Sequence, residues 1–335
     1  MKHFCAVLFI SIFITFSIAA LDNDILSFRI TPQIGLVNGS INEYVFDEEN
    51  SKNTDYKISQ LDWDIKNIPV LGVKAEFNIL RYIAINLSTS FGIPKISGYM
   101  QDYDWLNSYA GIDIEIPTSW IGDDPTELTN YSQHTNELKN YIDFYISAGG
   151  NIYLPFNLKL TPFLSYQYES IHLAGKQGFG RYKNKDKTFD IKDYSNNNQV
   201  ISYLQETNAM FLGLSVKFDN IPHTSLSADF FVSPKMTFLN AIDYHYTRSI
   251  AFWDKMSNIW QLKGNIEAQY NFNKYNKAGL FTSIQYIPVS KGDTSKKSIN
   301  SDGSLSDGKW VMISKNGGGT SRLIWSIGIN YSFSL

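Results

Sequence analysis

Apolar and polar side chains alternate through the last stretch of the chain, and this period of two most constrains the fold. From Leu323 to Leu335 every odd position is apolar or aromatic, whereas Ser, Gly and Asn fill the even positions from Ser326 on. Successive side chains of a strand point to opposite faces, so one face of this segment is apolar to its end. The pattern predicts a strand with lipid on one side and water on the other.

The same alternation recurs along the chain in segments joined by alternately short and long connections. Short turns are expected at Asn78–Arg81, Leu154–Asn157, Asp219–Pro222 and 273–276, and long polar segments at about 39–56, 101–137, 170–205, 240–257 and 288–318. This organisation predicts an all-β fold: a ten-stranded antiparallel transmembrane β-barrel with short periplasmic turns and long extracellular loops. Aromatic girdles would account for the aromatic share of 15%. A secreted β-sandwich is the alternative.

The first residues predict export. Lys2 precedes an apolar run from Phe4 to Ile18 and small residues near position 20. We expect residues 1–20 to be a cleaved signal peptide and residues 21–335 one outer-membrane barrel domain; a retained anchor helix is the alternative, although the run is shorter than the ~20 residues a span needs. The only cysteine, Cys5, lies in this segment, which excludes disulfides and thiol catalysis from the rest. A net charge of −3 without a long basic run argues against nucleic-acid partners.

Counting positions along the strands predicts where the chemistry-bearing side chains point. Even positions face the lumen in the third strand, which directs Asp102 and Asp104 inward if the register survives the intervening proline and glycine. Odd positions face the lumen in the first and seventh strands, which directs Glu43, Asp243 and His245 inward. We expect all five past the long-loop ends of their strands and beyond the membrane band, lining the outward-opening mouth.

Both pairs of residues have a use in catalysis and a plainer explanation. Two neighbouring carboxylates raise one pKa and can hold a water between them. The alternatives for Asp102 and Asp104 are a solvated loop or a calcium-binding turn. Asp243 could orient the imidazole of His245 and stabilise its charged form, and the alternative is an ordinary surface pair.

At "MQDYDWLNS" and "DYHY" the chain resembles the omptin family of outer-membrane proteases, and "SQLDWDIKN" is similar to the family's second-strand motif. The resemblance covers essentially the whole chain after the signal peptide. It implies an endopeptidase without metal or other cofactor, in which His245, held by Asp243, is the general base toward a water that Asp102 helps position. Asp104 would contribute negative charge to the pair. The expected substrates are cationic peptides or proteins.

The resemblance also implies a pocket for basic residues. Glu43, in "NEYVF", matches one of its acids, but Ala241 stands where the family has the second acid, so we expect a relaxed preference for Arg or Lys. No Lys or Arg occurs between Gln101 and Asn130, a segment that carries Asp102, Asp104, Asp113, Glu115, Asp123, Asp124 and Glu127. Such an acidic mouth should gather cationic peptides.

The resemblance also suggests lipopolysaccharide and outer-membrane lipid as partners. Omptins bind lipid A phosphates on a basic patch of the outer wall and are activated by them. In "YQYESIHLAGK" either Ser170 or Ile171 replaces the expected arginine, so this stretch does not support lipopolysaccharide activation. The basic stretch "KQGFGRYKNKDK" is interpreted as a solvated loop hairpin. The competing hypotheses are a catalytically silent barrel acting as an adhesin, a narrow pore, and a barrel phospholipase, which would need Ser and His on an outer face.

Overall fold

The computed structural model describes residues 26–46, 57–106, 127–184, 188–196 and 198–334. The predicted signal peptide lies outside these residues, as do Asp113, Glu115, Asp123 and Asp124. Most of the described chain is extended, and within it no helix is long and apolar enough to cross a membrane.

Most of the strands are long, and short connections alternate with longer ones. They are β1 (Leu26–Phe46), β2 (Lys57–Ile79), β3 (Ile83–Gly92), β4 (Lys95–Asp104), β5 (Asn130–Gly150), β6 (Ile152–Leu154), β7 (Leu158–Lys183), β8 (Phe189–Asp193), β9 (Gln199–Ile221), β10 (Thr224–His245), β11 (Ile250–Asn271), β12 (Asn276–Ser298) and β13 (Val311–Ser334). A single turn of 3-10 helix, η3 (Tyr246–Arg248), joins β10 to β11.

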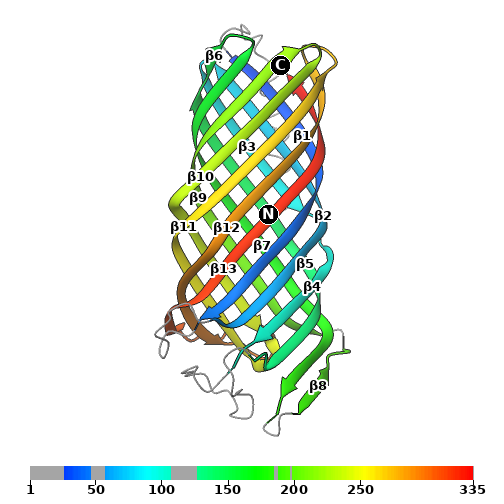
Figure 1. Ribbon diagram of the computed structural model, residues 1–335, viewed down its shortest axis with the longest axis vertical. Coiled ribbons are helices and arrows are strands. Elements are labelled where there is room, and N and C mark those ends of the chain that lie inside the picture. The colour runs from blue at the N-terminus through cyan, green and yellow to red at the C-terminus, as the bar shows by residue number, and fades with distance from the viewer. Residues whose placement is uncertain (1–25, 47–56, 107–126, 185–187, 197, 335) are drawn as a thin grey trace.

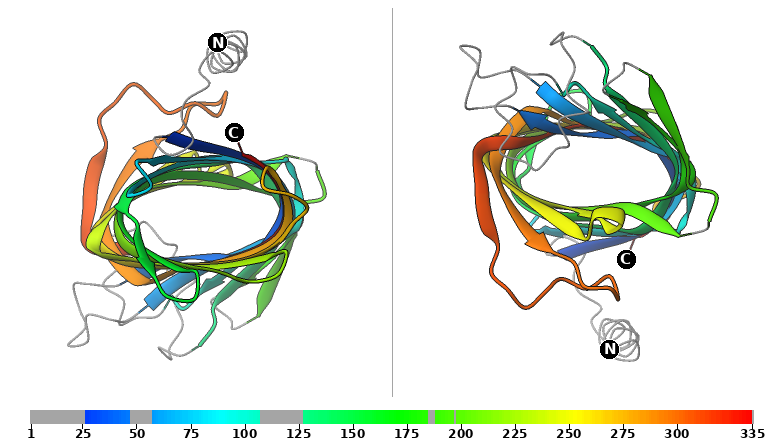
Figure 2. Two further views of the ribbon diagram at one scale, coloured as in Figure 1. Left: turned by 90° about the horizontal axis from the view of Figure 1, so that it is seen from above. Right: turned by 90° about the horizontal axis from the view of Figure 1, so that it is seen from below.

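The strands close into one antiparallel ring (Figures 1 and 2). β1 pairs with β13 on one side and with β2 on the other, which joins the two ends of the sheet. β3 and β4 are two halves of one wall strand, because each pairs with β2 and with β5. β6 belongs to the turn before β7, and β8 extends β7 beyond the wall. The wall therefore has ten strands, which confirms the predicted ten-stranded antiparallel barrel.

The two ends of the barrel differ. One end carries the short turns, and we call it the turn end; β6 marks it in Figure 1. Its hairpins use left-handed backbone, with positive φ at Leu80 and Arg81 and again at Phe156 and Asn157. Two-residue turns of this kind match the twist of the strands. The opposite end, which carries β8 and η3, is the loop end.

The strands continue far into the segments that were predicted to be long connections. β1 runs to Phe46, β10 to His245 and β12 to Ser298, and they stay paired along this extension. The prediction that the site residues lie past the ends of their strands was therefore wrong. Beyond the lipid a strand no longer needs an apolar outer face, so the alternation fades while the backbone pairing continues.

The site residues nevertheless lie outside the membrane-spanning part of the wall. Toward the loop end, the exposed large apolar side chains stop at Leu36 in β1, at Leu71 in β2 and at Phe238 in β10. Glu43 and His245 lie further along their strands. Asp102, Asp104, Asp243 and Asp254 occupy the same extension, since Asp102 pairs with Leu61 of β2 and Asp243 with Phe252 of β11.

Irregularities in the wall leave the predicted directions of the side chains intact. In β4, Ser97 and Gly98 oppose one residue of β5, and Gly98 adopts φ 80°, as a bulge requires. At the break between β3 and β4 the outward position changes from odd, at Phe91, to even, at Ile96, and the bulge changes it back at Tyr99. Met100 is therefore buried, and Asp102 faces inward. In β10 the bulge between Val232 and Thr237 adds two residues relative to β9, which preserves the inward direction of the odd positions.

An apolar cluster fills the lumen just below the loop end. It includes Ile41, Trp63, Met100, Tyr203 and Leu239, and we call it the apolar floor. The rings of Trp63 and Tyr203 stack with centroids 5.8 Å apart. Ile41 precedes Glu43 by two positions, and Met100 precedes Asp102 likewise. The acids of the loop end therefore lie directly above apolar side chains. These side chains separate the acids from water in the lumen below.

Candidate functional site

All five predicted site residues come together at the loop end of the lumen. Glu43 comes from β1, the Asp pair from β4, and Asp243 and His245 from β10. Burial raises the pKa of Glu43, and the charges of Asp243, Asp254 and Asp102 raise it further. The charge of Asp104 in turn acts on the His245 imidazole. Side chains from strands that do not pair with one another thus share one electrostatic environment.

Asp243 and His245 form a buried dyad. Oδ2 of Asp243 contacts Nε2 of His245, and both side chains are almost fully buried. Phe252 packs edge-on against the imidazole, with centroids 5.5 Å apart. The plainer explanation, an exposed pair, does not describe this arrangement. Burial and the nearby Arg248 lower the pKa of His245, against the opposing effect of Asp243, so the ring is neutral at neutral pH and can accept a proton.

The Asp pair is held by polar neighbours on one side and open on the other. Asn130 Nδ2 donates to Asp104 Oδ2 at 3.3 Å, and Ser59 lies opposite Asp104 in the register. Oδ1 of Asp102 is buried without a hydrogen-bond partner among the described residues. Burial raises the pKa of Asp102 and the charge of Asp104 raises it further, as expected for carboxylates that share a site.

Metal binding gains no support from this geometry. Within the described part of the chain, no group of three or more His, Cys, Asp and Glu side chains is arranged to hold a metal ion. The open oxygen of Asp102 and the neutral imidazole are instead suited to hold and deprotonate a water molecule.

Arg248, which the alternation of side chains did not predict, lies directly at the dyad. Its Nη2 donates to Nδ1 of His245 and lies 3.2 Å from Nε2. Burial raises the pKa of both carboxyls of the Asp pair, and the charge of the guanidinium opposes part of that rise. Arg248 reaches this position because η3 turns the chain back over His245. The alternation of side chains applies only within strands, so it could not predict this return.

A second missed residue is Asp254 of β11. Ala241 stands where the family resemblance leads one to expect the second acid of the pocket, and the structure buries this alanine. Its register partner across the β10 and β11 pair is Asp254, which is also buried. Thr294 Oγ1 donates to Asp254 Oδ1 at 2.6 Å. Asp254 falls at the far end of the connection predicted at about 240–257, beyond the residues whose directions were counted from the preceding strand.

The outer wall carries the segment where the family's basic patch was expected. Ser170 and Ile171, the two candidates for the arginine position, are both buried. Two lysines nearby, Lys139 and Lys176, both pair with Glu137, at 2.9 and 2.6 Å. The stretch from Lys176 onward forms a hairpin of β7 and β8, as predicted, although residues 185–187 lie outside the described part.

Comparison with known proteins agrees with the barrel fold. The Omptin family model matches residues 25–333. The chain belongs to the omptin family. The plasminogen activator of Yersinia pestis is 24% identical to it over 310 residues, which cover 92% of this chain and 90% of that protein. Protease 7 of Escherichia coli K12 is 23% identical over 308 residues, covering 90% and 88%. The crystal structure of the outer membrane protease OmpT from Escherichia coli matches with a TM-score of 0.79 at 19% identity, covering 92% of this chain and 97% of that one.

Membership of the family supports an omptin-like protease. It also places the barrel in the outer membrane with the loop end facing the exterior, which confirms the predicted location. The substrates of such a protein are peptides or proteins.

Proposed function

We propose that the protein is an endopeptidase that hydrolyses peptide bonds with a water held between the Asp102 and Asp104 pair and the Asp243 and His245 dyad. The observation that carries this proposal is the convergence of the two pairs, from strands that do not pair, above one apolar floor. A passive adhesin would gain nothing from burying carboxylate oxygens without partners, which costs free energy.

The roles follow from the contacts. Asp243 occupies Nε2 of the imidazole, so Nδ1 is the nitrogen that takes the proton of the water. Arg248 contacts Nδ1, and its exposed guanidinium must turn away before the water can bind there. Asp102 positions the water through its open oxygen, and Asp104 contributes negative charge to the pair. Water attacks the peptide carbonyl directly, without a covalent intermediate.

The preferred substrates would carry basic residues. Glu43 is buried and has an oxygen without a partner in the described part of the chain, which a basic side chain could fill with a charge-assisted hydrogen bond. The acids around it raise the local negative potential, which attracts cationic peptides.

The family resemblance raises activation by lipopolysaccharide, which the sequence at Ser170 and Ile171 does not support. Lys139 and Lys176 lie near these positions of the wall, and each is already engaged by Glu137. Cleavage by protein refolded in lipopolysaccharide-free detergent, measured before and after adding lipopolysaccharide, decides the requirement. A stimulation that Lys139→Gln and Lys176→Gln abolish would assign the lipid to this face.

The proposed function is tested with a mixed peptide library and mass mapping of the products. The refolded protein should cut internal bonds, and the cuts should be enriched after Arg and Lys. A folded barrel that retains peptides without cutting any of them would instead support the adhesin hypothesis.

A further inference from the structure

Asp254 supplies a carboxylate where Ala241 cannot. The two residues are directly opposite in the antiparallel pair of β10 and β11. Side chains at such positions lie on the same face of the sheet, with Cβ atoms about 4.5–5.5 Å apart. Ala241 is 1% exposed and Asp254 5% exposed, both on the lumen side. The pocket wall at this height therefore carries an acid on the neighbouring strand.

The Asp254 carboxylate is directed toward β1, the strand that carries Glu43. Thr294 on β12 donates to its Oδ1, and Gly318 on β13 leaves room for it. A Cβ on Gly318 would lie 2.2 Å from Asp254 Oδ1, so any side chain there would displace the carboxylate. Gly318 pairs with Val45 of β1, next to the pair of Thr320 with Glu43. The carboxylate of Asp254 thus leans across two strands in the direction of Glu43.

Neither acid has a cationic partner among the described residues. Glu43 is 3% exposed, and its Oε2 has no hydrogen-bond partner in the described part of the chain. Asp243, beside them, also has a buried oxygen, Oδ1, without a partner there. Buried acids that are not paired are costly, and a cationic ligand is what would compensate them.

We propose that Asp254 is the second acid of the pocket that receives the side chain before the scissile bond, in the role that Ala241 leaves empty. The inference rests on the proposed function and names the specificity of the same site. Two acids favour a basic side chain more strongly than Glu43 alone, so the preference is firm, in place of the relaxed one expected from Ala241. Each charge-assisted contact changes the selectivity about ten- to a hundredfold.

The test uses two peptides that differ only in arginine or its uncharged isostere citrulline before the scissile bond. The ratio of kcat/KM for the two peptides should fall about tenfold or more in Asp254→Asn. Asp307→Asn is the matched control, because Asp307 is exposed in the connection between β12 and β13 and its replacement removes the same charge. Adding Ala241→Asp to Asp254→Asn should restore the ratio. An unchanged ratio in Asp254→Asn would overturn the inference.

A second variant moves the carboxylate without removing its charge. Gly318→Ala should lower the ratio as well, because the added Cβ displaces Asp254. Heat-modifiable gel mobility confirms that each variant is a folded barrel. If Gly318→Ala and Asp254→Asn both fold and both keep the ratio, Asp254 does not select the substrate.

A binding measurement separates this inference from the proposed function. Fluorescently labelled forms of the two peptides are titrated onto His245→Ala and onto the same protein with Asp254→Asn, and anisotropy gives the two affinities. The preference for the arginine peptide should fall about tenfold with Asp254→Asn. A wild-type barrel that cuts neither peptide contradicts the proposed function, whereas an unaltered binding preference contradicts the role of Asp254.

Discussion

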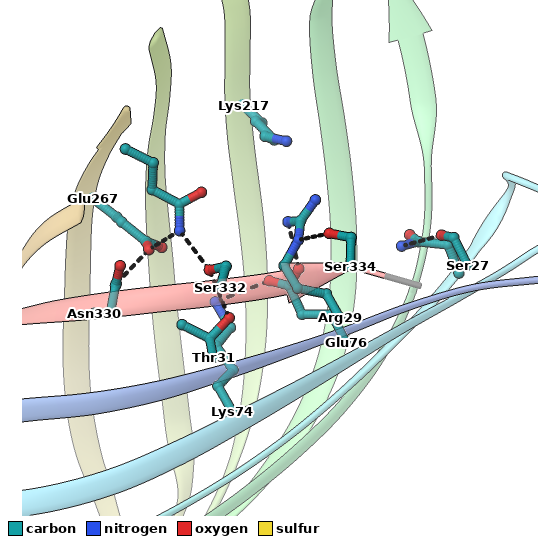
Figure 3. Close-up of polar contacts among 12 residues, drawn as sticks. Ser27, Arg29, Thr31, Lys74, Glu76, Lys217, Glu267, Asn330, Ser332 and Ser334 are labelled. Carbon is teal, nitrogen blue, oxygen red and sulfur yellow. Dashed lines mark hydrogen bonds and ion pairs between the residues drawn. The ribbon is translucent and has the colours of Figure 1, made fainter. Parts of the chain in front are cut away.

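The charged side chains at the two ends of the lumen differ in whether they are paired. At the turn end, shown in Figure 3, Arg29 donates to Glu76 at 2.8 Å and to Ser334 at 3.1 Å, and Lys74 lies 3.2 Å from Glu76. Glu267 there accepts hydrogen bonds from Gln269 and Asn330. At the loop end, Glu43, Asp102 and Asp243 each keep a buried oxygen without a partner among the described residues.

The difference separates structural charges from functional ones. Opposite charges that pair with each other offset the cost of their burial in the lumen, as Arg322 and Glu169 do between the two ends. Buried like charges with unpaired oxygens destabilise the protein when no ligand is bound. They are retained where a ligand supplies the missing hydrogen bonds or the opposite charge. The comparison predicts that changes at the loop end alter cleavage and that changes below it alter stability.

The largest effect is expected from the catalytic pairs. His245→Ala or Asp102→Ala should lower kcat by about 10²–10⁴, because each removes a group that moves or positions the attacking water. A peptide-cleavage assay measures the rate, and heat-modifiable gel mobility shows that the barrel is intact. Cleavage at the wild-type rate in both variants would contradict the mechanism.

Breaking the central ion pair should affect stability alone. Arg322→Met leaves the Glu169 carboxylate buried without its cation and should cost about 3–5 kcal/mol of unfolding free energy. Combining it with Glu169→Leu should recover most of this loss. Unfolding in detergent measures the stability, and the ratio of arginine to citrulline cleavage should not change. A change in that ratio would contradict the claim that residues below the loop end affect stability and not substrate selection.

Glu43→Gln should erase most of the preference for basic residues. It removes the charge of the predicted pocket acid, and the arginine peptide should lose about ten- to a hundredfold relative to the citrulline peptide. Mass mapping of cleavage in a peptide library shows the whole profile. The same profile in the variant and in the wild type would mean that Glu43 is not part of the pocket.

The smallest expected effect is the pH dependence of that preference. Burial raises the pKa of Asp254 to about 7, and burial raises the pKa of Glu43 well above its usual value. Asp254 is therefore largely protonated at pH 6 and charged at pH 8, so the preference for arginine should rise several-fold over this range. Asp243, Asp102 and Arg248 face the same space, and titration of His245 affects both peptides equally and cancels in the ratio. A preference that falls with pH would show that other groups control selection.

The sequence predicted the barrel, its strand number and the inward direction of the site residues. The direction of Asp102 depended on two irregularities that cancel, the break after β3 and the bulge at Gly98, and neither can be inferred from alternation. The extension of the strands past the lipid was not predicted, because hydrophobic alternation reports lipid contact and not backbone pairing. Asp254 was missed because it lies on this extension. Arg248 was missed because it follows a turn, where alternation does not apply.

The central claim is that the two pairs act on one water molecule, and a double-mutant cycle between Asp102 and His245 tests it most directly. Residues that act as a unit on one step are strongly non-additive. The rate of cleavage by Asp102→Ala combined with His245→Ala should therefore be about that of the slower single variant. Rate losses that multiply in the double variant would show that the Asp pair and the dyad work independently, and would contradict the account.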